Sequence, residues 1–465
     1  MTLSPPGPGR FISRADLQAV RHSPLHALCQ AAGQYGDVFQ YPVGFWTIYV
    51  VTAPDGIGRV LLDNHRNYRR DTFQQELFGL ITGQGLLASD GDYWFRQRRL
   101  AQPAFHRDRL VALAALTTEA TTAMLDRWAG CAARGEPLDI DDEMMQLTLE
   151  IVGEALFSVN LRQRVNALSR AALETMDYIA RRARSPIAPP PRVPTSGNRR
   201  FLAALRTLDA EIFALIAARR RAPDAANDLL SMLMLARDAD TGEGMTDRQL
   251  RDEIITFLIA GHETVASALV WAWYLLSLHP AVARILHTEL AAVLGGRLPT
   301  MADLPRLPYA RATLDETLRL YPPSWLNARR AKAADTLGGY AIPANALIVM
   351  SPYVTHRRAD VWPNPEGFDP DRFLPGADAD RPRFAYVPFG GGPHGCIGNS
   401  FALVEAQLIL ATVAQRYRLA LVPGQEIAIA PLVTLRPKYG MRMALHPVSP
   451  AIAYPHPVAR TVLSQ

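Results

Sequence analysis

The pattern of hydrophobic and polar positions divides the 465-residue chain into a long helical part and shorter segments that are typical of strands. From about Asp108 to His279, apolar residues recur at spacings of three and four, which predicts a series of amphipathic helices. Between residues 39 and 54, FQYPVGFWTIYVVTAP gathers β-branched and aromatic residues and predicts paired strands. We therefore expect a mainly α fold with a smaller β region.

Two irregular segments interrupt this pattern. SPIAPPPRVPTSGN, residues 185 to 198, cannot be helical because proline lacks an N–H donor and restricts the residue before it. It is either a surface connector between two long helices or a mobile lid over a buried pocket. FDPDRFLPGADADRPRFAYVPFGGG, from Phe368, is rich in Pro, Gly and Asp, so something must hold this segment in place.

Regular elements return in the last third of the chain. GGYAIPANALIVMSPYVTH, from Gly338, has strand signals, and FALVEAQLILATVAQRYRLA, from Phe401, has a helical pattern that paired strand-like segments follow. The expected organisation is a flexible N-terminal lead over residues 1–12, one domain over residues 13–446 and a C-terminal tail over residues 447–465.

Composition narrows the class of protein. Hydrophobic residues make up 49% of the chain and charged residues 20%, which allows a large core and excludes wholesale disorder. Cys29, Cys131 and Cys396 lie far apart, which argues against a disulfide framework or a CxxC zinc cluster. No stretch reaches the roughly 18 uninterrupted apolar residues of a membrane span, and the N-terminus lacks a signal-peptide pattern. We expect a soluble, cytoplasmic monomer.

The net charge of +5 raises the question of an anionic partner. Its positive residues are spread along the chain and do not gather in a tail. Nucleic-acid binding is therefore not expected, whereas a surface for an acidic protein partner is.

Cys396 is the first candidate for chemistry. It lies in FGGGPHGCIG, residues 389 to 398, immediately before a helical pattern, where free N–H groups and the helix dipole favour a thiolate. His394 lies two residues away, so a cysteine hydrolase remains an alternative. The glycines let the backbone pass close to a large flat object and leave N–H groups for the sulfur, which is the pattern of a haem ligand.

FGGGPHGCIG resembles the cysteine loop of the cytochrome P450 family, Phe-Gly-x-Gly-x-Arg-x-Cys-x-Gly. Phe389, Gly390, Gly392, Cys396 and Gly398 take the matching places. The resemblance implies that haem b lies between the central long helix and the helix after the loop, and that Cys396 is the axial ligand of its iron. His394 stands where the family most often has arginine, and an imidazole N–H can still bind a haem propionate.

Two further motifs follow the family order. ETLR resembles the Glu-x-x-Arg of the family, and FDPDRF resembles the loop whose arginine joins that pair. The resemblance implies a structural network of Glu316, Arg319 and Arg372 that holds the irregular segment beneath the haem. WFRQR resembles the Trp-x-x-x-Arg motif, which implies that Trp94 and Arg98 meet a haem propionate. Arg329 falls at the place of a second propionate arginine.

AGHETV, residues 260 to 265, lies inside a strongly apolar helical run, where polar groups are costly without a role. It resembles the oxygen-activating groove of the family, in which Ala260 and Gly261 give room beside the iron. Glu263 and Thr264 form the acid and alcohol pair of that groove. Splitting dioxygen consumes protons, and a hydroxyl that holds a water and is fed by a carboxylate can deliver them.

The resemblance also implies an apolar substrate pocket. Its walls are expected to contain Phe73, Leu77, Phe78, Phe257, Ser324, Trp325, Leu326, Leu432, Val433 and Thr434. Because most of these side chains are apolar, the expected substrate is lipophilic. A fatty acid, a terpenoid and a polyketide-like molecule remain open.

The resemblance implies a haem-thiolate monooxygenase that inserts one atom of O2 into such a substrate by hydroxylation or epoxidation. Only about seventy residues follow Cys396, so electrons are expected from NAD(P)H through a separate ferredoxin or flavodoxin with its reductase. Arg96, Arg98 and Arg99 form a basic cluster on which that partner could dock. The alternatives are a peroxide-using or non-oxygenating haem-thiolate enzyme and a haem-binding sensor without turnover.

Overall fold

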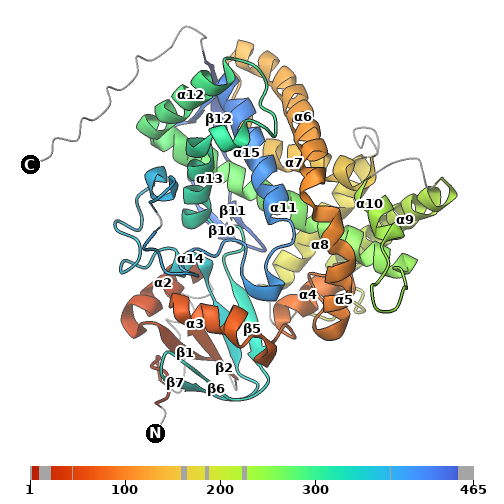
Figure 1. The fold of residues 1–465 in the computed structure, drawn as a ribbon, viewed down its shortest axis with the longest axis vertical. Helices are drawn as coiled ribbons and strands as arrows, with labels where there is room; N and C mark the ends of the chain where they lie inside the picture. Colours follow the sequence, from red (N-terminus) through yellow and green to blue (C-terminus); the bar gives the residue numbers. More distant parts are fainter. Residues whose placement is uncertain are drawn as a thin grey trace, which may run out of the picture.

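The computed structural model describes residues 3–9, 22–43, 46–158, 165–183, 188–222, 228–377 and 379–448. Helices account for most of these residues, and a smaller strand-rich region lies at the end of the molecule that holds the N-terminus (Figure 1). The prediction of a mainly α fold with a smaller β region is therefore confirmed. The helices are α2 (Pro24–Tyr35), α3 (Pro54–Gly58), α4 (Phe73–Thr82), α5 (Gly91–Ala101), α6 (Arg107–Arg134), α7 (Ile140–Phe157), α8 (Val165–Ala183), α9 (Ser196–Arg221), α10 (Leu229–Leu235), α11 (Asp247–Leu278), α12 (Pro280–Leu294), α13 (Pro308–Leu320), α14 (Pro352–Thr355) and α15 (Asn399–Arg416).

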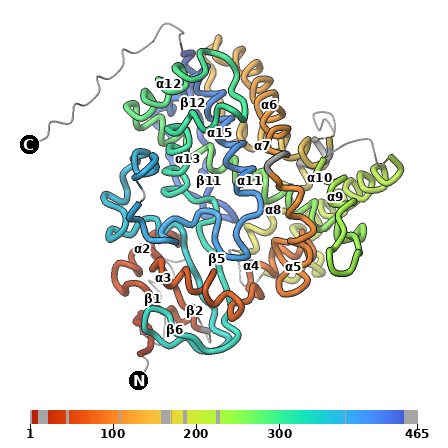
Figure 2. The backbone as a smooth tube through the Cα atoms, in the orientation of Figure 1, coloured from red at the N-terminus to blue at the C-terminus, as the bar shows by residue number. Residues whose placement is uncertain are grey.

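Helix α11 forms the centre of the helical part and packs against α7, α9, α13 and α15 (Figure 2). It begins with a capping box, in which the Thr246 hydroxyl accepts from the Gln249 N–H and the Gln249 side chain accepts from the Thr246 N–H. By length and composition this helix could cross a membrane, but most of it is buried inside the protein. It is therefore the core helix that joins the two largest hydrophobic clusters.

The main sheet has the strand order β1-β2-β8-β5-β3. Strands β1 (Val38–Val43) and β2 (Trp46–Val51) are antiparallel, which confirms the pair predicted from the aromatic and β-branched pattern. Strand β8 (Leu347–Met350) runs parallel to β2, and β5 (Asn327–Ala331) is antiparallel to both β8 and β3 (Tyr68–Arg69). This sheet carries Arg329 and holds the end of the segment that precedes α4.

Smaller sheets complete the fold. They consist of β6 (Asp335–Leu337) with β7 (Tyr340–Ile342), β10 (Ile429–Pro431) with β11 (Leu435–Pro437), and β4 (Leu138–Asp139) with β12 (Arg442–Pro447) and β9 (Tyr417–Leu421). The helix predicted from Phe401 to Ala420 was too long at its end. It stops at Arg416, because the next residues pair with β12 and form β9.

The proline-rich segment connects α8 and α9. Residues 188–195 are irregular, as predicted, and residues 185–187 lie outside the described part. The loop prediction was wrong for residues 196–198, which form the first turn of α9, because the Thr195 hydroxyl caps that turn by accepting from the Asn198 N–H. The Asn198 side chain donates to the carbonyls of Pro190 and Val193, 2.8 Å each, and so fastens the loop to the helix. Its role as a lid stays a prediction.

The described part of the chain includes residues 3–9 near its start and extends to residue 448. Leu3 bridges to Tyr340, and the Gln40 N–H donates to the Pro6 carbonyl at 2.8 Å, so residues 3–9 contact the sheet region. The tail that was predicted from residue 447 lies outside the described residues after residue 448. The division into lead, domain and tail stays a prediction.

Candidate active site

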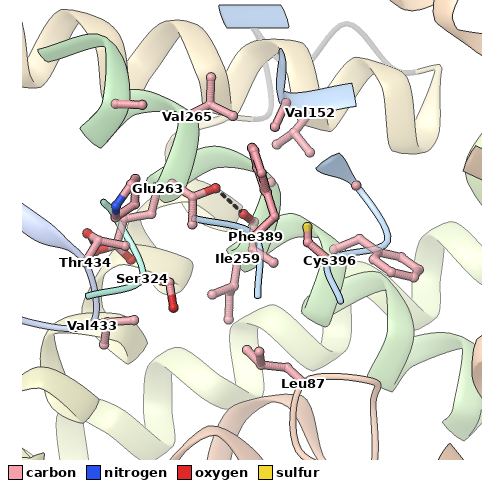
Figure 3. Close-up of a pocket in the computed structure, with 18 of the residues that line it drawn as sticks. Leu87, Val152, Ile259, Glu263, Val265, Ser324, Phe389, Cys396, Val433 and Thr434 are labelled. Atoms are coloured by element: carbon pink, nitrogen blue, oxygen red, sulfur yellow. Dashed lines mark hydrogen bonds between the residues drawn. The ribbon is translucent and has the colours of Figure 1, made fainter. Parts of the chain in front are cut away.

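A cavity of about 2310 Å³ lies between α11 and the segment that precedes α15 (Figure 3). Its wall is formed by α11, the loop around Cys396, α4, the residues before β5 and the turn between β10 and β11. A pocket for one small ligand usually measures roughly 300–1,000 Å³. This cavity therefore has room for a large cofactor and a substrate together.

The loop Phe389–Gly398 presents Cys396 to this cavity (Figure 3). The Cys396 N–H donates to the Phe389 carbonyl at 3.0 Å and closes the loop, and Gly398 is the N-cap of α15. Gly390 and Gly392 have φ of +68° and +63°, which favours glycine at both positions. A Cβ at Gly392 would lie 1.7 Å from the Leu61 carbonyl oxygen, so this glycine also allows the loop to pack closely against Leu61.

The Cys396 thiol is exposed to the cavity but has protein on its other sides. Burial raises the pKa of this thiol, while the Gly398 N–H and the charge of Arg98 lower it. Without a bound cation the thiol form is favoured. Thiolate ligation of a metal releases that proton, and the Gly398 N–H then remains a donor to the sulfur.

Two buried arginines face the same cavity. The Arg70 guanidinium donates to the Leu86 and Leu87 carbonyls at 3.0 and 2.8 Å, and its Nε has no partner among the described residues. Arg329 donates to the Ala328 carbonyl at 2.8 Å. Burial lowers the pKa of Arg70 to about 9 and that of Arg329 to about 10. The charge of the Asp90 carboxylate opposes this effect at both arginines, so one negative charge faces two positive charges.

This excess of buried positive charge is the observation that tests the fit of haem. Buried charges are stable when they are paired. The two propionates of haem b are anions that would pair Arg70 and Arg329, and Cys396 on the same wall would bind the iron. The residues present therefore fit haem. Arg70 was missed in the sequence, because nothing in NYRRDTF distinguishes a buried arginine from its exposed neighbours.

Trp94, Arg98 and His394 lie together beside this cluster and line the same cavity. The Trp94 indole N–H donates to the Leu86 carbonyl at 3.1 Å, and Arg98 donates to the Gly395 carbonyl at 3.0 Å. Arg98 thus ties α5 to the cysteine loop. The His394 ring packs against Trp94 at an interplanar angle of 38°, with 3.9 Å between the ring centroids. Burial and the charge of Arg70 lower the pKa of His394 to about 2, so the imidazole is neutral.

Helix α11 presents Ala260, Gly261 and Thr264 to the cavity, and these are the half-buried positions in a stretch that is otherwise buried. Gly261 also permits close packing of α7, because a Cβ there would lie 2.8 Å from Val152 Cγ2. The acid and the alcohol do not bind each other. The Thr264 hydroxyl donates to the Ala260 carbonyl at 2.7 Å, and Glu263 accepts from the Thr434 hydroxyl at 2.8 Å.

The structural network is present as a buried cluster. Arg319 donates to both carboxylate oxygens of Glu316 at 2.6 and 2.7 Å, and both side chains are fully buried. Arg372 Nε lies 3.5 Å from Glu316 Oε1. Arg319 also donates to the carbonyls of His356, Pro365 and Gly367. These bonds hold the irregular segment after α14, which is the support that the sequence required.

Most of the expected substrate-pocket residues line the cavity. They are Leu77, Phe78, Phe257, Ser324, Trp325, Leu326, Leu432, Val433 and Thr434. Phe73 is the exception, because it begins α4 at the surface and its side chain is 50% exposed. The Trp325 indole N–H donates to the Leu432 carbonyl at 3.0 Å and joins two walls of the pocket.

Two arginines of the basic cluster on α5, Arg96 and Arg99, form ion pairs within the protein. Arg99 pairs with Asp238 and Asp240 at 2.7 Å each, and Arg96 pairs with Glu243 at 3.0 Å. These three acids lie in the loop before α11, so its charge neutralises that of the two arginines. The sequence could not indicate this, because the acids are about 140 positions away.

Glu253 fastens the loop between α4 and α5 to α11. Its carboxylate accepts from the Leu86 N–H at 3.1 Å, and the Leu86 carbonyl in turn holds Arg70 and Trp94. The other oxygen of Glu253 is buried without a partner among the described residues. Burial raises the pKa of Glu253 from its usual 4.5 to about 8.

We expect the stability of the wild-type protein to decrease as the pH rises, because of Glu253. Between about pH 4.5 and 8 the folded protein keeps this proton and the unfolded chain has lost it, so unfolding releases a proton. The measured quantity is the free energy of unfolding of wild type minus that of Glu253→Gln at the same pH. As the pH rises, this difference should decrease by up to about 1.4 kcal/mol per pH unit, and it should level off above pH 8. Urea unfolding at pH 5, 7 and 9 measures this, and Glu119→Gln on the exposed face of α6 serves as control. Parallel profiles for Glu253→Gln and wild type would contradict it.

Comparison with known proteins identifies the family. The cytochrome P450 family model matches residues 5–441. Cyclooctatin synthase of Streptomyces melanosporofaciens is 37% identical over 92% of this chain and 91% of its own, and cyclooctat-9-en-7-ol 5-monooxygenase of the same organism is 36% identical over 90% of each. Pentalenene oxygenase of Streptomyces avermitilis is 32% identical over 91% of this chain and 92% of its own.

The fold agrees with this result. A crystal structure of the cytochrome P450DA heme domain matches with a TM-score of 0.89 at 25% identity and covers 97% of this chain and 98% of that chain. Together with the cavity, the cysteine loop and the buried arginines, these matches decide the assignment. The chain belongs to the cytochrome P450 family and is a monooxygenase.

Proposed function

We propose that this enzyme hydroxylates or epoxidises a terpenoid-like molecule at a haem held by Cys396. The observation that carries the proposal is one cavity that has an apolar wall on one side and, on the other, Cys396 with two buried arginines, for which the described part of the chain offers no ion pair. Its volume exceeds what a single ligand needs. When bound, haem iron with a thiolate ligand supplies the cleavage of dioxygen.

The residues around the cavity have defined tasks in this proposal. Cys396 would bind the haem iron, and Arg70 and Arg329 would pair with the propionates. Arg98 holds the cysteine loop in position through the Gly395 carbonyl. Thr264 holds a water against α11, and Glu263 supplies protons to it. The apolar wall excludes bulk water, so that protons arrive only through these side chains.

Two observations support a terpenoid-like substrate: the apolar side chains of the cavity wall and the names of three relatives. Phe78, Phe257, Trp325 and Leu326 make a broad apolar surface that suits a compact hydrocarbon skeleton. Ser324 adds a hydroxyl to this wall (Figure 3). Three relatives carry names of terpenoid-modifying enzymes, and one of these names specifies an alcohol as substrate. We therefore favour a terpenoid, with or without a hydroxyl group, over a fatty acid or a polyketide-like molecule.

Electrons are proposed to come from NAD(P)H through a separate ferredoxin or flavodoxin and its reductase. The local pairing of Arg96 and Arg99 makes them poor anchors for an acidic partner. A hydrolase that uses Cys396 and His394 is not favoured, because the ring nitrogens of His394 face Arg70 at 3.5 Å and Asp90 at 3.6 Å. The ring also packs against Trp94 at a tilt.

Turnover with labelled oxygen tests the proposal. The purified protein, with a surrogate ferredoxin, its reductase and NADPH, is incubated under ¹⁸O₂ with a panel of cyclic sesquiterpenes, diterpenes and their alcohols. We expect at least one product that carries a single ¹⁸O atom. Thr264→Ala should still consume NADPH but release mainly hydrogen peroxide, since it lacks the hydroxyl that holds the water.

Two results would contradict the proposal. One is oxygen consumption that no terpene raises above the rate without substrate, while fatty acids do raise it. The other is product formation by Thr264→Ala with unchanged coupling of NADPH to product. The first result would contradict the proposed substrate class, and the second would contradict the proposed role of the Thr264 hydroxyl.

A further inference from the structure

The Ser324 hydroxyl differs from the other buried and half-buried hydroxyl groups on the cavity wall. Thr256 and Thr264 donate to carbonyls of α11 at 2.8 and 2.7 Å, and the Thr434 hydroxyl donates to a carboxylate at 2.8 Å. Ser324 is half-buried and lines the same cavity, but no residue of the described part of the chain forms a hydrogen bond with its hydroxyl. A molecule that enters the cavity therefore meets a hydroxyl without a partner.

The segment that carries Ser324 is fixed on both sides. Two buried prolines precede Ser324, and a proline ring restricts its backbone to a narrow range of φ. Trp325 follows it, and the Trp325 indole N–H donates to the Leu432 carbonyl at 3.0 Å. The Trp325 carbonyl accepts from the Ser351 hydroxyl at 2.8 Å. The Ser324 hydroxyl thus has a fixed place on the wall before a substrate binds.

The wall next to Ser324 is apolar. Trp325 and Leu326 follow it in the chain and line the cavity with Val433 of the turn between β10 and β11. Figure 3 shows Ser324 and Val433 on one side of the cavity and Cys396 on the other. An oxygen atom that binds to Ser324 is therefore held away from the Cys396 side, and another part of the same molecule faces that side.

Two other polar side chains near this segment have different surroundings. Asn327 begins β5, and side chains two positions apart on a strand point to the same face of the sheet. Asn327 therefore shares a face with Arg329, which was matched above to a haem propionate. The Gln74 side chain on α4 donates to the Leu326 carbonyl at 3.3 Å. Ser324 is thus the polar group that the apolar part of the wall offers to a substrate.

We propose that Ser324 binds a hydroxyl group of the substrate, so that the enzyme selects cyclic terpenoid alcohols over the corresponding hydrocarbons. This proposal rests on the proposed function and narrows its substrate class. A serine hydroxyl donates one hydrogen bond and accepts others, and an alcohol can take part in both. A hydrocarbon in the same place either covers the Ser324 hydroxyl without a partner or leaves a water molecule on it, and both cost binding free energy.

The place of this enzyme in a reaction sequence follows from the anchor. The reaction that supplies the substrate must introduce the first oxygen, either by hydroxylation or by a terpene cyclisation that ends in the capture of water. This enzyme then oxygenates a different carbon, because Ser324 holds the first oxygen away from the Cys396 side of the cavity.

Calorimetric titration of the holoenzyme with matched ligands tests the proposal. The pairs are cedrol with cedrane and sclareol with labdane, delivered in cyclodextrin, and each pair shares one carbon skeleton. Comparison between protein variants cancels the different partition of alcohol and hydrocarbon into the carrier. Ser324→Ala should lose about tenfold in affinity for an alcohol that wild type binds, and should keep its affinity for the paired hydrocarbon. Ser324→Thr, which retains a hydroxyl, should restore the alcohol affinity.

Ser23→Ala is the matched control, because Ser23 also lines the cavity but is exposed at its mouth, and its side chain makes no cap bond to α2. It should bind both members of each pair like wild type. The products provide a second measurement. From an alcohol that wild type oxygenates at one carbon, Ser324→Ala should give several positional isomers, because the first oxygen no longer fixes the molecule.

Three results would overturn the role of Ser324. They are an equal loss of affinity for alcohol and hydrocarbon in Ser324→Ala, no loss for either, and a loss of alcohol affinity in Ser23→Ala that matches the one in Ser324→Ala. A merely structural serine would give the first of these, since a distorted wall weakens both ligands. Failure of the proposed function would appear separately, as folded, haem-loaded wild-type protein that binds neither the alcohols nor the hydrocarbons.

Discussion

Replacing Cys396 with alanine should abolish the strongly red-shifted Soret band that the dithionite-reduced wild-type protein gives under carbon monoxide. The physical reason is that a thiolate donates electron density to haem iron, and no other side chain of the cysteine loop can replace that donation. His394 is turned towards Asp90 and Arg70. The measurement is the carbon monoxide difference spectrum of the two proteins, with haem content determined in parallel.

Cys131→Ala is the matched control, because this cysteine lies near the end of α6 and does not line the cavity. It should give the wild-type spectrum. A red-shifted band in Cys396→Ala would show that another residue binds the iron. If the wild-type protein takes up no haem even when haem is supplied during expression, haem is not its cofactor and the proposed function is wrong.

Glu316→Gln should lower the free energy of unfolding by about 3–5 kcal/mol, because it leaves the Arg319 guanidinium buried without its carboxylate. The same carboxylate accepts from the Asp369 N–H at 2.9 Å and faces Arg372, so the change also loosens the attachment of the segment from Phe368 to α13. Equilibrium urea unfolding, followed by tryptophan fluorescence, gives the difference. We also expect Glu316→Gln to lose haem at lower urea concentrations than the wild-type protein.

Glu366→Gln provides the comparison, since Glu366 is 71% exposed and pairs with Arg357 at 3.1 Å. An exposed pair contributes about 0–1 kcal/mol, so this variant should remain close to wild type. Equal effects of the two substitutions would contradict the view that burial makes the Glu316 pair important. A stable Glu316→Gln with normal haem content would show that the segment is held by its other contacts.

Much of the fold and part of the site could be predicted because the signals are local. The polar residues of AGHETV interrupt an apolar helix, and the ETLR residues lie one turn apart, so both motifs are visible in short stretches, although their roles came from the family resemblance. The cysteine loop was recognised from ten consecutive residues. Errors at element ends arose where tertiary pairing overrode local pattern, as at β9, where Tyr417 and its neighbours pair with β12.

The sequence by itself determined the family, the helical core and the position of Cys396, because these depend on order and spacing along the chain. Only the tertiary structure decided which polar groups meet. The Arg70 N–H meets Asp90, the Thr434 hydroxyl meets Glu263, and the Arg436 guanidinium meets Asp141, across 20, 171 and 295 positions of the chain. Whether an arginine is buried, neutralised or exposed depends on the elements that pack around it, and so the electrostatics of the site exist only in the folded protein.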